Sequence, residues 1–232
     1  MVTVFAGAPP PELPLSAFAQ VVHELMGCKE LTAAEVLKLR RSEDEAAVTT
    51  LGARHHWLNH LDAPYRGPYT RPQAFRGPLH ADDVDLAASI AADVLRLWQA
   101  TPDATLYLPL GVGGHVDHRV CFAVAQTLTR AGVRCWHYED FPYAAWAVDA
   151  VEHRLASLDA PFVARSVDVT SQIDSRLAAI QCYRSQLSYL FPDQSDPLRR
   201  ARAFAESRAP SASAFAERFW ASPSTTWTAP SA

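Results

Sequence analysis

The order of apolar and polar positions divides the chain into short strands and longer helices. Runs of four to eight mostly apolar or β-branched residues are typical of strands, and apolar residues spaced three and four apart are typical of helices. Strands are predicted at 1–6, 55–60, 106–110, 134–138 and 162–169. Helices are predicted at 17–26, 33–51, 83–100, 119–128, 173–190, 198–206 and 214–220.

Capping residues support several of these helices. Ser16 precedes the first, and Thr32 with Glu35 three residues later forms the sequence pattern of a capping box for the second. Gly52 follows that second helix at a position where glycine commonly ends helices. These are local signals, so they predict helix ends without reference to the rest of the fold.

Strands that alternate with helices predict an α/β fold, with a Rossmann-like, mostly parallel sheet and helices on both faces. A chain of 232 residues is long enough to bury one sizeable core. We predict a single domain over residues 1–221, followed by a Ser-, Thr- and Pro-rich tail at 222–232 that is disordered.

Composition excludes several classes of partner. The net charge of −4 gives no electrostatic basis for binding nucleic acid or anionic lipid. No apolar run reaches the roughly 20 residues of a membrane span, and the N-terminus has no signal-peptide pattern. The four cysteines contain no CxxC pair, which favours reduced, buried thiols. A soluble, cytoplasmic protein is expected. The sequence does not determine the oligomeric state, and a homo-oligomer is compatible with it.

The densest group of potentially catalytic or metal-binding side chains lies between the predicted strand at 106–110 and the helix that follows. A glycine-rich turn, 111–114, leads into His115, Asp117 and His118. In open α/β sheets ligands bind beyond the carboxyl ends of strands, which is where these residues fall. The turn lacks the GxGxxG and Gly-Lys-Ser/Thr patterns, so phosphate binding is the weaker hypothesis.

Two readings of His115-Val-Asp-His118 remain open from the residues alone. Histidines can bind a catalytic zinc, and a second histidine oriented by a carboxylate can transfer a proton or stabilise an oxyanion. In the alternative, Asp117 caps the helix and both histidines are surface residues.

The segment 109–119, Pro-Leu-Gly-Val-Gly-Gly-His-Val-Asp-His-Arg, resembles the second signature of the PIG-L/LmbE-like family of zinc-dependent N-deacetylases. Other stretches resemble that family in the same order, over nearly the whole chain. They are Arg40-x-x-Glu43, Asp62 with Tyr65-Arg66, Tyr138-Glu-Asp-Phe-Pro-Tyr143 and Tyr183-x-Ser-Gln186.

The resemblance implies roles for five residues. His118 would be a zinc ligand, His115 would stabilise the tetrahedral intermediate or protonate the leaving amine, and Asp117 would orient His115. Arg40 and Asp62 would contact the substrate, which in this family is commonly an N-acetylated sugar such as N-acetylglucosamine within a larger conjugate. Zn²⁺ is the cofactor that the resemblance implies.

One part of the family pattern is absent from the sequence. The family's first signature, His-Pro-Asp-Asp, supplies two zinc ligands and the general base, and the 232 residues do not contain it. Met1–Ala6 resembles the family's second strand, so we expect the first strand to be missing. His80-Ala-Asp-Asp83 imitates the signature but stands at a helix start, where capping explains it. His60 with Asp62 is the next candidate for substitute ligands.

Two functional hypotheses follow. The first is a zinc-dependent hydrolase that removes an N-acetyl group from an N-acetylglucosamine-type sugar or conjugate. The second is a catalytically incomplete relative that binds a sugar or a partner protein. They differ in whether two further metal ligands accompany His118.

Overall fold

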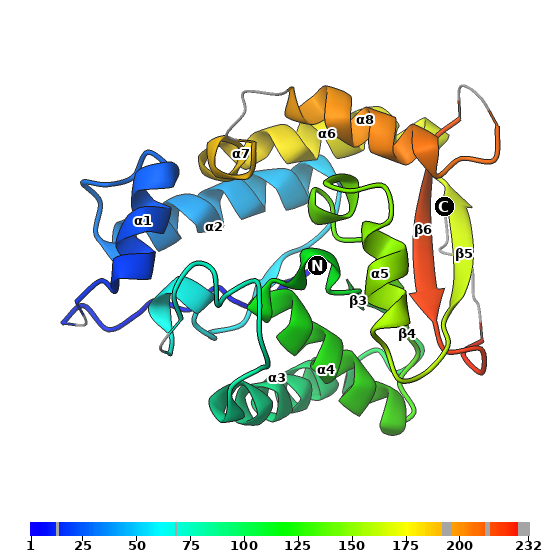
Figure 1. Cartoon of the computed structure of the whole chain (residues 1–232), viewed down its shortest axis with the longest axis horizontal. Coiled ribbons are helices and arrows are strands. Elements are labelled where there is room, and N and C mark those ends of the chain that lie inside the picture. Colours follow the sequence, from blue (N-terminus) through cyan, green and yellow to red (C-terminus); the bar gives the residue numbers. More distant parts are fainter. Residues whose placement is uncertain (13, 68, 192–195, 212–213, 227–232) are drawn as a thin grey trace. The chain divides into compact units, whose positions relative to one another are not determined.

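The computed structural model describes residues 1–12, 14–67, 69–191, 196–211 and 214–226. The chain forms two compact units (Figure 1). Unit 1 contains Met1–Ala74 and Thr170–Ala203, and unit 2 contains Phe75–Val169 and the chain from Phe204 onward. The single domain over 1–221 stays a prediction, and most of the predicted tail, 227–232, lies outside the described residues.

Unit 1 combines a two-stranded parallel sheet with helices. Its elements are β1 (Val2–Thr3), α1 (Ala17–Leu25), α2 (Ala33–Thr50), β2 (His56–Trp57), α6 (Ile173–Cys182), α7 (Arg184–Leu190) and the start of α8 (Pro197–Ser207). In the sheet, Val2 lies opposite His56 and Thr3 opposite Trp57. Both strands are shorter than predicted, and an isolated antiparallel bridge joins Phe5 to Asn59 beyond them.

The predicted caps of unit 1 are confirmed. The Ser16 hydroxyl accepts the Ala19 N–H at 3.0 Å, and Thr32 and Glu35 form both hydrogen bonds of the capping box. The single helix predicted at 173–190 is wrong in one respect, because Tyr183 separates α6 from α7. There the Ser185 N–H donates to the Glu43 carboxylate at 2.8 Å, and the Tyr183 hydroxyl donates to Asp44 at 2.8 Å. These contacts with α2 replace a continuous helical ladder.

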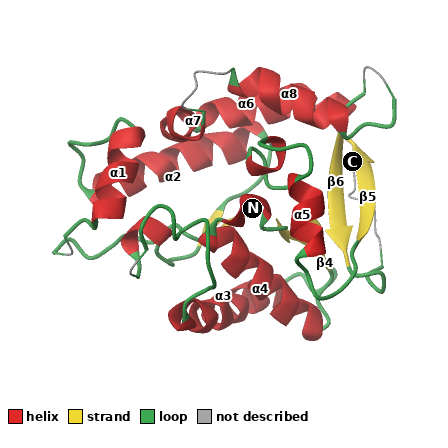
Figure 2. Ribbon diagram, viewed as in Figure 1, coloured by secondary structure: helices red, strands yellow, loops and turns green. Residues whose placement is uncertain are grey.

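Unit 2 contains a four-stranded mixed sheet and three helices besides the end of α8. Its elements are α3 (Ala81–Gln99), β3 (Leu106–Pro109), α4 (Val116–Arg130), β4 (Cys135–Tyr138), α5 (Ala150–Ala156), β5 (Val163–Asp168) and β6 (Ala216–Ala221). The strand order is β3-β4-β6-β5. Strands β3 and β4 are parallel, and β6 runs antiparallel to both of its neighbours. Figure 2 shows the arrows of β5 and β6 pointing in opposite directions. The α/β class is confirmed, with β1–β2 and β3–β4 as the described parallel pairs.

The helix predicted at 214–220 is wrong, since this segment forms β6. Its alternate side chains face opposite ways, as in any strand. The Phe219 ring packs edge-on against Tyr107, with centroids 5.0 Å apart, and the Trp220 Nε1–H donates to Glu139 at 2.9 Å. Aromatic residues favour strands when such neighbours are available. Pairing with β4 and β5 therefore decides this segment, and local propensity does not.

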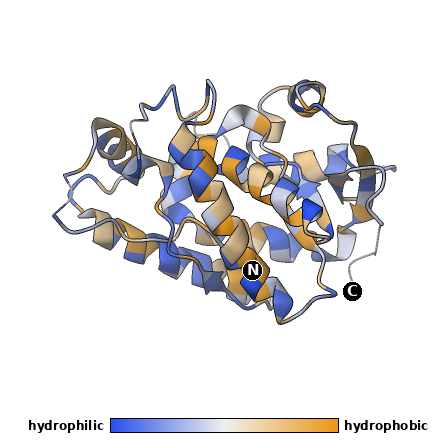
Figure 3. Ribbon diagram, turned by 90° about the horizontal axis from the view of Figure 1, so that it is seen from below, coloured by the Kyte–Doolittle hydropathy of each residue, from blue (hydrophilic) through white to orange (hydrophobic). Residues whose placement is uncertain are grey.

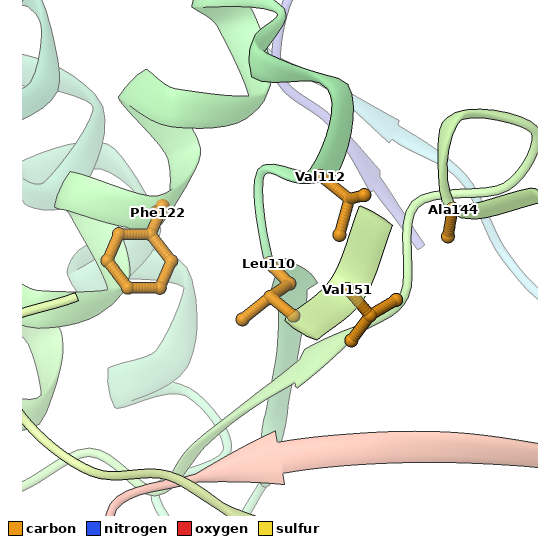
Figure 4. Close-up of a cluster of buried hydrophobic side chains, with 5 residues drawn as sticks. All are labelled: Leu110, Val112, Phe122, Ala144 and Val151. Atoms are coloured by element: carbon orange, nitrogen blue, oxygen red, sulfur yellow. The ribbon is translucent and has the colours of Figure 1, made fainter. Parts of the chain in front are cut away.

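The core of unit 2 surrounds the end of β3. Figure 4 shows the five members of one buried cluster, with Phe122 on α4 facing Leu110 and Val151 beside it; the members are Leu110, Val112, Phe122, Ala144 and Val151. Helices α3 and α4 pack together (Figure 1). Hydrophobic and hydrophilic residues alternate along the helical ribbons, as amphipathic helices require (Figure 3). Among the described helices, none is both long and apolar enough to cross a membrane.

Candidate active site

The glycine-rich turn after β3 is shaped by close contacts that exclude larger side chains. Gly113 has φ +79°, and a Cβ placed there would lie 2.6 Å from the Cβ of Tyr143. Gly114 has φ +76°, and a Cβ there would lie 2.6 Å from the Phe75 carbonyl oxygen. Glycine alone satisfies both the left-handed backbone and the lack of space. The turn therefore brings His115 directly to the start of α4.

His115 caps the N-terminus of α4 through its imidazole. The Asp117 N–H donates to His115 Nδ1 at 3.3 Å, and the Asp117 carboxylate lies 4.0 Å from the same nitrogen. Because Nδ1 accepts this hydrogen bond, the neutral ring carries its proton on Nε2. The site gains a donor at Nε2, on a side chain that is 14% exposed.

His118 has the opposite arrangement. Its Nδ1 lies 2.6 Å from Oδ1 of Asp140, whose side chain is fully buried. A carboxylate oxygen accepts hydrogen bonds from ring N–H groups, so this contact suits a His118 ring with a hydrogen on Nδ1. Metal-binding histidines commonly have this carboxylate at the second ring nitrogen. The geometry leaves the 30% exposed His118 ring with an acceptor atom at Nε2.

Asp140 contacts the candidate site but was not singled out from the sequence, where it was only part of the segment 138–143. It also accepts the N–H groups of Gly111 and Val112, both at 2.9 Å and both at Oδ2. It follows β4 as Gly111 follows β3, and Pro109 lies opposite Tyr138 in the parallel register. Parallel neighbours end at the same edge of the sheet, so an acidic residue just after β4 was the available signal.

Aromatic rings surround the two histidines. The His115 and His118 centroids are 5.4 Å apart, and the Tyr143 centroid lies 6.4 Å from His115 and 5.3 Å from His118. Phe75 meets His115 edge-on at 4.9 Å. Such rings restrict the rotation of both imidazoles and lower the local polarity, which strengthens hydrogen bonds made there.

The end of β4 is fixed by a buried ion cluster. Glu139 accepts from Arg208 Nε at 2.6 Å and from Arg218 Nε, and it also holds Trp220. His137 belongs to β4, and burial lowers its pKa to about 4, so this histidine is neutral near pH 7, with Nδ1 3.1 Å from the Pro109 carbonyl oxygen. These contacts hold the strand end that carries Asp140.

Arg40 and Asp62, the other predicted site residues, pair with each other in unit 1. Asp62 also accepts the Ala63 N–H at 2.9 Å. Arg40 borders a cavity of about 150 Å³, which is lined by residues of β1, α2, β2 and the start of α7 with their neighbours: Thr3, Phe5, Ala6, Leu37, Arg40, Arg41, Glu43, Asp44, Trp57, Tyr183 and Gln186. The structure thus brings His115, Asp117 and His118 together in unit 2, and Arg40 and Asp62 together in unit 1.

The described residues do not include a complete set of ligands for a metal ion. Among the residues that the structure describes, no group of three His, Cys, Asp or Glu side chains could hold a metal ion. His80 and Asp83 cap α3, with the His80 N–H donating to Asp83 Oδ2 at 3.2 Å, as the capping interpretation predicted. His60 and Asp62 do not belong to a group of three either, so neither predicted substitute completes a zinc site within the described part of the chain.

Comparison with known proteins shows that the chain is similar to deacetylases. The chain is 34% identical to 2'-N-acetylparomamine deacetylase of Streptomyces fradiae over 159 residues, 66% of this chain and 55% of the relative. It spans little more than half the length of that relative. The chain is homologous to deacetylases. No protein-family model matches it.

Solved structures agree in fold. The A40926 pseudoaglycone deacetylase Dbv21 is 27% identical with a TM-score of 0.74, over 94% of this chain and 82% of that one. A deacetylase complex from teicoplanin biosynthesis is 27% identical with a TM-score of 0.78, over 94% and 84%. The zinc inhibited form of teicoplanin deacetylase Orf2 is 25% identical with a TM-score of 0.76, over 94% and 85%. The resemblance to LmbE-type deacetylases is confirmed for the fold.

Proposed function

We propose that this chain carries the proton-handling part of an N-deacetylase that hydrolyses the acetamide of an N-acetylated amino sugar or its conjugate. The observation that carries the proposal is the pair of adjacent imidazoles after β3, one a donor and one an acceptor at Nε2, in a homologue of deacetylases. The relatives include a 2'-N-acetylparomamine deacetylase and a deacetylase of teicoplanin biosynthesis, which favours a sugar within a larger molecule, such as an N-acetylglucosamine-type unit.

His115 is the proposed catalytic acid. Its Nε2–H can donate a hydrogen bond to the oxygen that becomes negative when the amide carbonyl is attacked, and the ring in its protonated, imidazolium form can give a proton to the departing amine. Asp117 orients the ring through its backbone N–H, and its carboxylate lies 4.0 Å from Nδ1. Arg40 and Asp62 are proposed to bind polar groups of the substrate.

Zinc is the proposed cofactor of the complete enzyme, with Nε2 of His118 as one ligand. Bound zinc would supply a water that loses its proton near neutral pH. The described residues do not fit a whole zinc site, because a catalytic zinc takes three protein ligands and no group of three is present among them. This chain's own residues therefore account for orientation and proton transfer, and two more ligands are required.

The test compares the 232-residue chain with the same chain extended by an N-terminal segment that carries a His-Pro-Asp-Asp motif. Zinc content and acetate release from N-acetylglucosamine and 2'-N-acetylparomamine are measured for both. We expect the extended form to bind one zinc and release acetate. An extended form that binds no zinc and releases no acetate from either compound would show that the proposal is wrong.

The incomplete metal set favours one alternative, a non-catalytic relative that binds a sugar or a partner protein. It predicts that the 232-residue chain binds N-acetylated sugars without releasing acetate, in the presence or absence of added zinc. Stoichiometric zinc together with acetate release by this chain would exclude the alternative.

A further inference from the structure

The Asp140 carboxylate divides its two oxygens between the backbone and a side chain. Oδ2 receives two donors, the N–H groups of Gly111 and Val112, each at 2.9 Å. Oδ1 faces Nδ1 of His118 at 2.6 Å. The backbone donors cannot change roles, so Oδ2 must remain an acceptor in any state of the site.

We propose that Asp140 is a positioning residue that fixes the tautomer of His118 with the proton on Nδ1. The carboxylate is anchored by the turn after β3, and its remaining oxygen then dictates where the imidazole proton lies. Nε2 of His118 is thereby kept as an electron-pair donor. The tautomer follows from the geometry alone, and its importance for deacetylation rests on the function proposed above.

The asymmetry of the carboxylate makes a sharp prediction for Asp140→Asn. The amide has one acceptor and one donor end, and the two backbone N–H groups require its oxygen at the Oδ2 position. The NH₂ group must then point at His118 and donate to Nδ1. His118 accordingly moves its proton to Nε2 and loses the lone pair there, while the turn keeps both of its hydrogen bonds.

Histidine nitrogen NMR on the 232-residue chain tests this directly. With ¹⁵N-labelled histidine at a pH where imidazoles are neutral, we expect a protonated Nδ1 and an unprotonated Nε2 for His118. His118→Gln identifies the signals by their loss. Asp140→Asn should exchange the two types of signal, and Asp140→Ala should release the ring to a mixture of tautomers.

Asp149→Asn is the matched control, because Asp149 also faces a histidine, His153, at 3.4 Å, but both side chains are exposed. It should leave the His118 signals unchanged. A proton on Nε2 of His118 in the unsubstituted chain overturns the proposal, and that spectrum decides even if Asp140→Asn does not fold. An Asp140→Asn spectrum with the proton still on Nδ1 also overturns it.

Activity separates this proposal from the function proposed above. In an extended form that releases acetate, Asp140→Asn should lower kcat/KM about 10- to 100-fold, the range for a lost partner of a ligating histidine. If the tautomer exchanges but no form releases acetate, the proposed function fails and the positioning role stands. If the tautomer exchanges while acetate release is unchanged, Asp140 has no part in the reaction.

Discussion

His115 and His118 lie less than one helical turn apart in sequence, and their Nδ1 atoms have opposite hydrogen-bonding roles. His115 Nδ1 accepts from the Asp117 N–H, and His118 Nδ1 donates to Asp140. With the ring centroids 5.4 Å apart, a donor and an acceptor Nε2 arise on neighbouring rings. The proposed function gives these two nitrogens different tasks, hydrogen-bond and proton donation at His115 and zinc binding at His118, so exchanging either role should impair it.

Replacing His115 by Asn should separate capping from chemistry. Asn is a good N-cap, so we expect the free energy of unfolding to change by less than about 1 kcal/mol. Loss of the imidazole should lower acetate release by an acetate-releasing form about 10²- to 10⁴-fold. His153→Asn, on the exposed face of α5, is the control and should change neither quantity. Unaltered acetate release in His115→Asn would contradict the assigned role.

Replacing Arg40 by Gln should weaken substrate binding. A lost charge-assisted hydrogen bond costs about 1.5–3 kcal/mol, which raises KM roughly 10- to 100-fold while kcat changes little. Steady-state kinetics on an acetate-releasing form measure both constants. Arg96→Gln removes an exposed pair with Asp93 and should leave KM unchanged. A fall in kcat alone would place Arg40 in the chemical step and not in binding.

Replacing Gly113 by Ala should destabilise unit 2 through both backbone and contact. A left-handed backbone costs an L-residue about 1–2 kcal/mol, and the Cβ would also meet the Cβ of Tyr143 at 2.6 Å. Overpacking adds about 1–3 kcal/mol. Gly132→Ala is the matched control, since Gly132 has φ +86° and open space around it. Urea unfolding should show a larger loss for Gly113→Ala, and equal losses would refute the packing argument.

Replacing Glu139 by Gln should show how much the ion cluster around Glu139 contributes to the free energy of unfolding. The Glu139 side chain is 2% exposed and faces both Arg208 and Arg218, so neutralising it removes the buried negative charge that both cations share. We expect the free energy of unfolding to fall by about 3 kcal/mol. Glu152→Gln, whose carboxylate is 59% exposed and 3.9 Å from Arg218, should cost less than about 1 kcal/mol. A similar cost for both would show that burial is irrelevant here.

The stability of the chain should fall between neutral and acidic pH because of His137. Its pKa drops from 6.5 to about 4 in the folded state, chiefly through burial. On acidification the unfolded chain therefore binds this proton first. The contribution of neutral His137 to the free energy of unfolding is therefore complete above pH 6.5. It decreases as the pH falls from 6.5 through 4, by at most about 3 kcal/mol in total. Denaturation at a series of pH values should show a shallower loss in His137→Gln, and an unchanged slope would contradict this.

Local signals predicted the helices well because a cap acts within four residues. Ser16 and the Thr32–Glu35 capping box place the starts of α1 and α2 correctly from sequence alone. The segment that forms β6 lacked such a signal, and its structure depends on β4 and β5, which lie far away in sequence. The break at Tyr183 likewise depends on Asp44 and Glu43 of α2. Distant partners explain these two errors, whereas α5 (Ala150–Ala156) was not predicted from the sequence at all.

In the candidate site, too, residues marked by a local sequence pattern were predicted, and a residue that depends on distant contacts was not. His115, Asp117 and His118 were found because they are contiguous and match a known signature. Asp140 lies 22 residues from His118 in sequence, and only the pairing of β3 with β4 brings them together. A residue whose role comes from strand register has no local pattern to mark it.

The position of β6 has a consequence for the order in which the protein is made. This strand lies between β4 and β5, yet it is synthesised after both. Until residue 221 has left the ribosome, the two earlier strands have no partner at the edges that β6 will occupy. The two ion-pair partners of Glu139, Arg208 and Arg218, also lie in this later part of the sequence. The sheet of unit 2 therefore cannot be completed before the segment that forms β6 is available, and until then the strand end beside Asp140 lacks its contacts with Arg208 and Arg218.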